Sequence, residues 1–390
     1  LHSFPTRRSS DLDVNRDGHL DLFVGNEATR GQESARSPLY LNQGDGTFRR
    51  LAGEASFDVN GVVKGADWGD VNNDGNPDLY VSRADTRNIL LLNVTKPSDT
   101  VPRFREITRQ AGVAEPLHSS TAWFWDVNND GYQDLFVGTH PYPRQNPARD
   151  YASVFLNRDT AVEPSHLYLN QGNGTFRRME PDRAPARSFY VQGSNYGDLN
   201  LDGYPDLYLG IGADRSQTSL VPNRLYVNQK GRRFVDVTIR TGTGHVGQTG
   251  SALFADFDGD GTHGIFAVMG GVFNLSEYRD VFFENPGQTN NWLSLELRGT
   301  SANRFGVGAK IQVNAATSDG QSRTIYSTVD NGGGRGASPY REVIGLGEMQ
   351  RVRSMTITWP DRSLEEQVLK DVPINEHLTV HQNRSQPEVR

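Results

Sequence analysis

The stretch Asp70–Asp78, with the sequence DVNNDGNPD, decides the fold because it recurs along the chain at nearly regular intervals. Close copies begin at Asp13, Asp126 and Asp198, and a degenerate copy begins at Asp256. Successive copies start 57, 56, 72 and 58 residues apart. A period of this size indicates a repeat architecture. The longer third interval predicts an insertion within residues 140–165, where four prolines cluster.

The residues between the copies are typical of short strands. A run such as Leu79–Val81 follows each copy, and segments such as Gly65–Gly69 and Gly193–Gly197 precede it. Leu39–Phe48 and Leu167–Phe176 read LYLNQGDGTF and LYLNQGNGTF. Their Asp-Gly and Asn-Gly pairs predict tight hairpins in which both turn positions take positive φ. Four strands per repeat, without helical periodicity, predict an all-β fold built from β-propeller blades.

The repeated stretches, called Asp loops 1 to 5 in chain order, carry side-chain oxygens at positions 1, 3 and 5 and Gly at position 6, and loops 1 to 4 also carry Asp at position 9. Calcium takes about six to eight hard oxygen ligands, whereas magnesium prefers fewer protein ligands plus water. Zinc or copper would require His or Cys side chains, which the pattern does not place. We therefore predict Ca²⁺ bound by these side chains and by the carbonyl of position 7. The predicted ligands are Asp13, Asn15, Asp17, His19 and Asp21 in loop 1; Asp70, Asn72, Asp74, Asn76 and Asp78 in loop 2; Asp126, Asn128, Asp130, Tyr132 and Asp134 in loop 3; Asp198, Asn200, Asp202, Tyr204 and Asp206 in loop 4; and Asp256, Asp258 and Asp260 in loop 5.

Two alternatives compete with this interpretation. An EF-hand needs Glu at position 12 and flanking helices, but position 12 is Val24, Val81, Val137 or Leu209 and lies in an expected strand. Asx turns without metal would explain one copy; four matching copies favour calcium. In loop 5 Gly264 replaces the position-9 Asp, which predicts weaker or absent binding and leaves about four sites.

Composition excludes several classes of protein. The chain has 390 residues and no Cys, which excludes disulfides and thiol chemistry. The formal charge is −7, and four bound Ca²⁺ would bring it to +1. Most of the acidity is therefore ligand charge, and no basic cluster predicts binding to nucleic acid. No apolar stretch approaches the roughly 18 residues of a transmembrane helix.

The tail lacks Asp loops and alternates like half-buried strands. About six strands in residues 286–384 predict a small β-sandwich, with residues 385–390 as a terminal tail. The alternating segments are Leu293–Leu297, Ile311–Val313, Thr324–Val329, Met355–Trp359 and Leu378–Val380.

On these motifs, residues 13–285 resemble the FG-GAP/VCBS calcium-loop β-propellers, the class that includes the integrin α head. The order of Asn291–Leu293, Asn303–Ala309, Gly345–Gly347 and Thr358–Asp361 resembles the ASPIC/UnbV domain. Together they resemble bacterial homologues of the cartilage acidic protein family. The resemblance implies an exported or extracellular calcium-binding protein without a common enzymatic activity. Such propellers commonly have about seven blades, so about five repeats imply that one or two N-terminal blades are missing.

The N-terminus is interpreted as foreign. Residues 2–12 match, in one reading frame, the translation of a common sequencing-adapter DNA, so residues 1–12 are excluded from fold reasoning. We expect a signal peptide to have preceded the first true repeat, which gives a periplasmic, cell-surface or extracellular location.

Three functions fit the sequence. The first is non-enzymatic adhesion or recognition of a protein or glycan ligand, with calcium holding the blade loops. The second is a polysaccharide lyase, for which His118, His140 and Arg144 beside the long repeat are the suspects. The third is a structural spacer. The tryptophans beside the loops, Trp68, Trp123 and Trp125, are expected in the blade cores rather than on a sugar-binding face.

Overall fold

The computed structural model describes residues 8–27, 36–51, 57, 59–96, 98–99, 101–139, 152–153, 156, 163–185, 190–211, 221–270, 279–330 and 338–390. These residues form strands joined by turns, with short helices such as α1 (Thr108–Ala111) and α3 (Thr238–Thr241). No helix in the described ranges is long and apolar enough to cross a membrane, as the sequence predicts.

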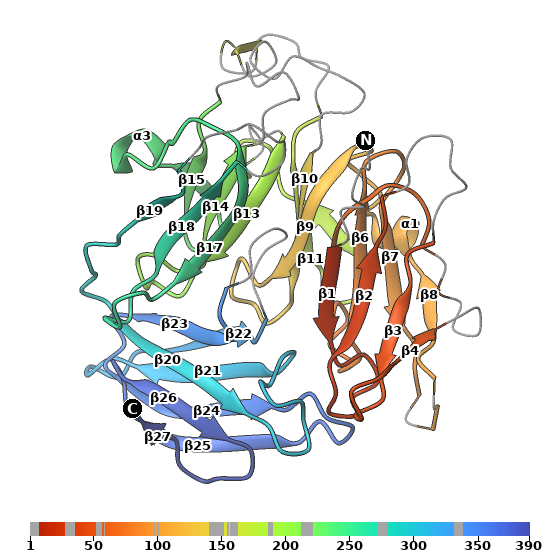
Figure 1. The fold of residues 1–390 in the computed structure, drawn as a ribbon. Helices are drawn as coiled ribbons and strands as arrows, with labels where there is room; N and C mark the ends of the chain where they lie inside the picture. Colours follow the sequence, from red (N-terminus) through yellow and green to blue (C-terminus); the bar gives the residue numbers. More distant parts are fainter. Residues whose placement is uncertain are drawn as a thin grey trace.

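Five antiparallel sheets follow one another along the first three quarters of the chain (Figure 1). The first four sheets have four strands each, and the fifth has three strands in the described residues. The strands of sheets 1 and 2 are β1 (Arg8–Leu12), β2 (Asp21–Gly25), β3 (Leu39–Asn42), β4 (Phe48–Leu51), β5 (Val63–Gly69), β6 (Asp78–Arg83), β7 (Ile89–Asn93) and β8 (Phe104–Glu106). Those of sheets 3 to 5 are β9 (Ser119–Trp125), β10 (Asp134–Thr139), β11 (His166–Asn170), β12 (Phe176–Arg178), β13 (Val191–Gly197), β14 (Asp206–Ile211), β15 (Arg224–Asn228), β16 (Phe234–Asp236), β17 (Thr249–Ala255), β18 (Gly264–Met269) and β19 (Val281–Phe283).

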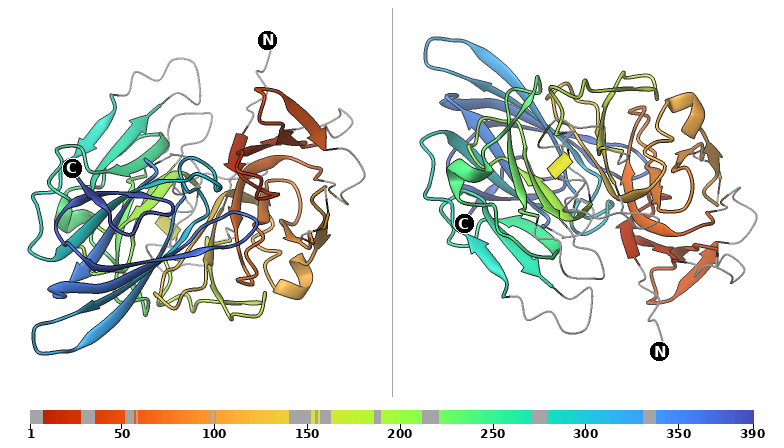
Figure 2. Two further views of the ribbon diagram at one scale, coloured as in Figure 1. Left: turned by 90° about the horizontal axis from the view of Figure 1, so that it is seen from below. Right: turned by 90° about the horizontal axis from the view of Figure 1, so that it is seen from above.

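The sheets pack as propeller blades. Their first strands contact one another in chain order, β1 with β5, β5 with β9, β9 with β13 and β13 with β17, and Figure 2 shows them as an arc around a common centre. The apolar clusters lie between successive sheets; Trp68 joins blades 1 and 2, while Trp123 and Trp125 join blades 3 and 4. All three tryptophans are buried, so their expected place in the blade cores is confirmed. The predicted all-β propeller of about five blades is confirmed as well.

The hairpins are where the sequence places them, but their turns differ from the prediction. Between β3 and β4 the Gln43 N–H donates to the Thr47 carbonyl at 3.0 Å. Gly44 and Gly46 have φ of 75° and 86°, and the intervening Asp45 is not in the positive-φ region. Its carboxylate instead accepts the Thr47 N–H at 2.9 Å. The two-residue turn with positive φ at both positions is therefore wrong: a longer loop distributes the positive φ over two glycines.

The C-terminal quarter is a β-sandwich, as predicted. One sheet has the order β23-β20-β26-β27 and the other β22-β21-β24-β25. The strands are β20 (Asn291–Arg298), β21 (Lys310–Ala316), β22 (Ser322–Thr328), β23 (Arg341–Gly347), β24 (Arg351–Thr358), β25 (Glu366–Val372), β26 (His377–His381) and β27 (Glu388–Val389). Residues such as Leu295, Val313 and Trp359 fill the space between the sheets. The sequence analysis missed β25 because only Leu369 and Val372 of this strand are buried.

The fold includes five residues that the sequence analysis excluded. Arg8–Leu12 is β1, which pairs with β2 from Arg8↔Gly25 to Leu12↔Asp21. A strand edge needs only backbone donors and acceptors from its neighbour, so an extended segment of almost any composition can complete it. Leu12 adds a buried side chain to the core between blades 1 and 2. The foreign origin of this segment stays a prediction.

Candidate metal centres in the Asp loops

All five Asp loops lie at the same end of the arc. Each connects the first and second strand of its blade, as loop 2 does between β5 and β6. In Figure 1 these connections face the sandwich, which lies across the ends of the blades. The structure therefore brings the repeated acidic sequences together into one layer between two domains.

The backbone of each loop curls through two positions with positive φ. Gly at position 6 has φ between 82° and 92° in loops 1 to 4, as the sequence predicts. Position 4 is also left-handed, with φ of 55° at Arg16, 57° at Asn73, 58° at Asn129 and 56° at Leu201. Non-glycine residues rarely take this conformation. The sequence analysis missed it because this position has no constant residue type.

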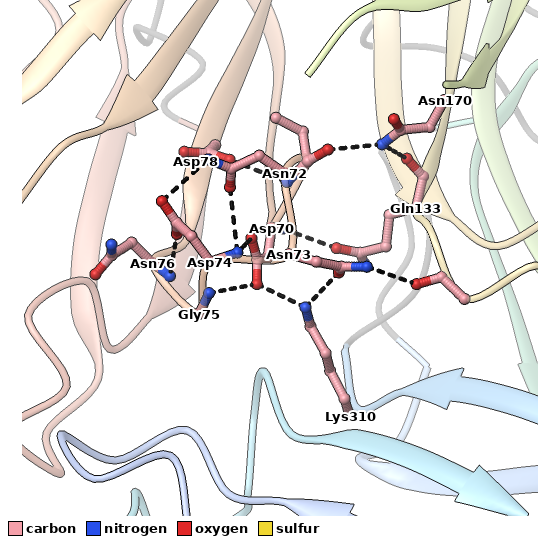
Figure 3. A network of polar contacts seen from close by, with 12 residues as sticks. Asp70, Asn72, Asn73, Asp74, Gly75, Asn76, Asp78, Gln133, Asn170 and Lys310 are labelled. Carbon is pink, nitrogen blue, oxygen red and sulfur yellow. Dashed lines mark hydrogen bonds and ion pairs between the residues drawn. The ribbon is translucent and has the colours of Figure 1, made fainter. Parts of the chain in front are cut away.

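In loop 2 the first carboxylate closes the curl (Figure 3). Asp70 Oδ1 accepts the Asp74 N–H at 3.0 Å, and its Oδ2 accepts the Gly75 N–H at 2.8 Å. At position 5, Asp74 Oδ1 accepts the Asn76 N–H at 2.8 Å, and Asn72 donates to its other oxygen. The corresponding bonds recur in loops 1, 3 and 4. The side chains at positions 1, 3 and 5 are thus linked to one another and to the backbone of the curl.

The position-9 carboxylate connects the loop to the rest of its blade. Asp78 Oδ2 accepts the Val71 N–H at 2.9 Å, and Oδ1 accepts the Asn93 N–H at 2.7 Å from β7. Asp21, Asp134 and Asp206 make the same pair of bonds. All four side chains are buried. Position 9 therefore fixes the loop against the third strand.

Burial raises the pKa values of carboxyl groups at positions 1 and 9 of the loops. Loss of hydration is the main cause, and it raises the pKa to about 7 at Asp13, Asp126 and Asp198 and to about 8 at Asp21. Repulsion from the other carboxylates of the same loop adds to the effect. A buried group of like charges is stable in ionised form only when a cation compensates it.

The donor set fits a hard divalent cation. Loops 1 to 4 each offer three carboxylates and one amide oxygen from a preformed curl, and oxygen-only sets of this kind suit Ca²⁺. The backbone hydrogen bonds use one lone pair of each carboxylate oxygen involved, so further lone pairs remain for a cation. The residues present are therefore compatible with the calcium that the fold family implies.

Loop 5 has a different donor set. Asp258 replaces the position-3 Asn, and Gly264 replaces the position-9 Asp. Among the described Asp loops, this is the one in which an oxygen from each of three carboxylates, Asp256, Asp258 and Asp260, lies within 4.8 Å of the other two. Gly259 and Gly261 supply the positive φ at positions 4 and 6. The predicted weakness of this loop toward calcium stays a prediction.

A repeated asparagine, missed by the sequence analysis, connects each loop to the next blade. In blade 3 the Asn170 side chain donates to the Val71 carbonyl of loop 2 at 2.9 Å (Figure 3). The equivalent bonds run from Asn93 to Val14, from Asn228 to Val127 and from Asn285 to Leu199. The recurrent LYLN sequence was visible, but only its strand character was used.

The sandwich contacts the loops at their fourth positions. Asn129 of loop 3 exchanges two 2.8 Å hydrogen bonds with the backbone of β22, at Thr324 and Tyr326. In loop 4 the Leu201 carbonyl accepts the Gly347 N–H at 2.8 Å. In loop 5 the Gly259 carbonyl lies 3.1 Å from His377 Nε2. The left-handed fourth position thus presents loops 3 to 5 to the sandwich.

Two basic residues of the sandwich strengthen this contact. Lys310 Nζ lies 2.6 Å from Asp70 Oδ2 and also bonds Asn73 Oδ1 (Figure 3). Arg323 donates to the Asp202 carbonyl at 2.6 Å and lies over the Tyr204 ring at 4.3 Å. Both residues are far in sequence from the loops that they contact, so no local pattern could indicate them.

A cavity of about 320 Å³ lies where loops 1 and 2 approach the sandwich. Its wall includes Asp13, Asp70 and Lys310 beside the apolar side chains of Trp68 and Trp359. The first carboxylates of both loops therefore border a space large enough for an ion and its water.

Of the three residues suspected of lyase activity, the structure describes only His118. His118 Nδ1 lies 2.8 Å from the Ala84 carbonyl. His140, Arg144 and most of the predicted insertion lie outside the described residues. No observation on the described part of the chain favours catalysis by these residues.

Comparison with protein families matches FG-GAP-like repeats to residues 13–81, 126–209 and 198–266, which together cover more than half of the chain. The chain belongs to the FG-GAP-like repeat family. Residues 299–387 of this FG-GAP-like protein match the ASPIC and UnbV domain. This combination is the one that the sequence motifs predict.

Curated relatives of this FG-GAP-like protein fall into two groups. Human integrin alpha-6 is 31% identical over 93 residues, and mouse integrin alpha-7 is 34% identical over 92 residues; each alignment covers 23% of this chain and 7% of the relative. Cartilage acidic protein 1 from Xenopus tropicalis is 24% identical over 365 residues, which cover 92% of this chain and 42% of the relative. The chain thus spans less than half the length of each of these relatives.

Proposed function

We propose that this FG-GAP-like protein is a calcium-stabilised protein of the cell surface, periplasm or extracellular space that acts in adhesion or recognition without catalysing a reaction. The observation that carries the proposal is the buried position-9 carboxylate of loops 1 to 4, which joins a curled acidic loop to the third strand of its blade. The matches to integrin alpha subunits support the adhesive role.

Calcium in these loops would stabilise more than the loops themselves. The loops are connected to the next blade through Asn170 and its equivalents, and to the sandwich through the residue at their fourth position. An ion that binds only the folded protein stabilises it by mass action, by about 2.7 kcal/mol per site at a hundred times the Kd. Several occupied loops would therefore hold blades and sandwich together.

The test of calcium binding is a calorimetric titration of the metal-free chain with Ca²⁺, paired with thermal melts in calcium and in chelator. We expect about four binding events and a large upward shift of Tm in calcium. A parallel titration with Mg²⁺ should give weaker binding, because magnesium retains several waters. Absence of binding heat together with identical Tm in both buffers would contradict the calcium proposal.

Recognition requires a separate test, because binding of calcium does not identify a ligand. The calcium-loaded chain would be applied to arrays of purified matrix proteins and glycans, with chelator as the control. We expect at least one ligand whose binding is lost in chelator. If calcium binds but no array member does, the recognition role fails while the calcium role stands.

A further inference from the structure

We propose that Glu115, Glu163 and His166 form a binding site for one divalent transition-metal ion, for which Zn²⁺ is the best-fitting candidate. The site lies in blade 3, at the end of β10 and the start of β11. Loop 3 lies at the opposite end of the same strands, where Asn170 bonds Asp134. The inference is independent of the calcium proposal.

The three side chains converge on one point. One ligand atom from each lies within 4.8 Å of the other two. His166 Nε2 is 3.7 Å from Glu163 Oε1, and Glu163 Oε2 accepts the Leu117 N–H at 3.0 Å. Ligands bound to zinc at roughly 2.0–2.2 Å lie about 3–4 Å from one another. Small side-chain adjustments would therefore bring the atoms to coordination distance.

Hydrogen bonds fix which nitrogen of His166 faces the carboxylates. The Tyr168 O–H donates to the Glu115 carbonyl at 2.9 Å, which uses its one proton. The Tyr168 oxygen must then accept the hydrogen bond from His166 Nδ1, at 2.8 Å. His166 therefore carries its proton on Nδ1, and Nε2 presents a bare lone pair. Metal-binding histidines are commonly oriented in this way by a partner on the other ring nitrogen.

Among the described residues, that lone pair has no hydrogen-bond partner. His166 is only 1% exposed, and its Nε2 is a buried nitrogen without a described donor in reach. Glu163 Oε1, 3.7 Å away, is also an acceptor, so the two atoms repel each other. A buried polar atom left unsatisfied costs about 1–3 kcal/mol. A cation between the three groups removes both the repulsion and the missing bond.

Arg178 interacts electrostatically with both His166 and Glu163. Its positive charge opposes a second proton on the imidazole and also weakens the attraction of the cluster for a metal ion.

The ligand types distinguish this site from the Asp loops. One imidazole nitrogen and two carboxylate oxygens suit zinc and neighbouring first-row metals, whereas the loops offer oxygen alone. Three protein ligands leave at least one position open for water. We therefore expect zinc to bind here even when calcium fills the loops.

The experiment titrates the full chain with Zn²⁺ by calorimetry in excess Ca²⁺, so that the loops are already occupied. We expect one zinc per chain, and at least a tenfold weaker Kd in Glu163→Gln and in Glu115→Gln. The control is Glu180→Gln, an exposed acid of the same blade, which should leave zinc binding unchanged. Co²⁺ should give the visible absorption bands of a nitrogen- and oxygen-ligated ion in the wild type and lose them in both variants.

Both test residues are at least partly exposed, so their variants should fold, and melts without zinc check this. His166→Gln is a supporting variant only, because the buried ring also contacts Tyr168. Zinc binding of equal stoichiometry and affinity in wild type, Glu115→Gln and Glu163→Gln would overturn the proposal. So would absence of zinc binding to the calcium-loaded wild type.

Discussion

At the scale of single residues, two aspartates of one loop have different surroundings and so different expected roles. Asp74 at position 5 is exposed, and its hydrogen bonds to described residues stay within loop 2. Asp78 at position 9 is fully buried and accepts N–H groups from Val71 and Asn93. The first is therefore suited to hold an ion, and the second also holds the blade.

We predict that Asp74→Ala lowers the Tm in calcium and changes it little in chelator. Asp78→Ala should destabilise the chain in both buffers, by roughly 2–4 kcal/mol, because two buried donors lose their acceptor. Melts and denaturant unfolding of the two variants in each buffer measure the difference. An equal loss for Asp74→Ala with and without calcium would show that its carboxylate is structural and not a ligand.

A second residue-scale prediction concerns pH and Glu342, a half-buried acid on β23 of the sandwich. Glu342 accepts the Ser327 hydroxyl at 3.0 Å, and burial, together with the neighbouring Asp330 charge, raises its pKa to about 8. The folded chain therefore keeps a proton that the unfolded chain releases above its pKa of about 4.5. This contribution to stability is complete at low pH and is lost as the pH rises through about 8.

Glu342→Gln stays neutral and should not lose that contribution. We expect its Tm to gain on the wild type between pH 6 and pH 9, and melts of both proteins at these two pH values give the comparison. Other groups titrate in both proteins, so the difference between them reports Glu342 together with Asp330, whose charge acts on it. A difference in Tm that does not change with pH would contradict the assignment.

At the scale of the element, successive blades are joined by one repeated hydrogen bond as well as by apolar packing. Asn170 donates to Val71 of the preceding blade and to Gln133 of its own, and its Oδ1 accepts the Gly172 N–H. Asn42 of blade 1 has the same place in its strand, but its described side-chain donation reaches only Leu20 of its own blade.

This difference provides a matched pair of variants. We predict that Asn170→Ala destabilises the chain by roughly 2–4 kcal/mol, because a buried carbonyl of each of two blades loses a donor. Asn42→Ala should cost at least about 1 kcal/mol less, since no carbonyl of a second blade is involved. Denaturant unfolding in calcium measures both. Equal losses would mean that the bond between blades adds nothing measurable.

Much of the element scale could be predicted from the sequence. The strands beside each loop, such as β5 and β13, and the hairpins after Leu39 and Leu167 follow local alternation and glycine placement. The left-handed fourth position could not be predicted, because Arg16 and Leu201 carry no signal for it. The β25 strand was missed because its two buried residues, Leu369 and Val372, are three positions apart and its Val368 is exposed, so the strand lacks a regular apolar–polar alternation.

At the scale of the whole molecule, the sandwich lies on the layer of Asp loops (Figures 1 and 2). Lys310 and Arg323 reach loops more than a hundred residues away. Such contacts depend on how two finished domains meet, and local sequence patterns do not record this. The same holds for Glu115 and His166, which lie apart in the sequence and meet only because two strand ends adjoin.

We predict that Lys310→Met tightens calcium binding at loop 2 by roughly tenfold. The ammonium group lies against Asp70 Oδ2, so it competes with a cation for the same carboxylate, and its removal relieves repulsion of about 1 kcal/mol or more. Calorimetric titration resolves this if one site shifts while the others do not. Lys370→Met, at an exposed position of β25, is the matched control. Unchanged affinity at every site would show that Lys310 moves away when calcium binds.

The fourth position of the loops has a consequence for how this protein can evolve. The first four loops offer a cation the same set of side-chain donors. Their contacts with the sandwich differ: Asn73 bonds Lys310, Asn129 bonds the backbone of β22, and the Leu201 carbonyl accepts the Gly347 N–H. Each of these repeats thus has a loop residue suited to one region of the sandwich. A blade that is duplicated, deleted or exchanged with its neighbour would face a region that its loop does not fit. The repeats are therefore not interchangeable in position, although their sequences are similar.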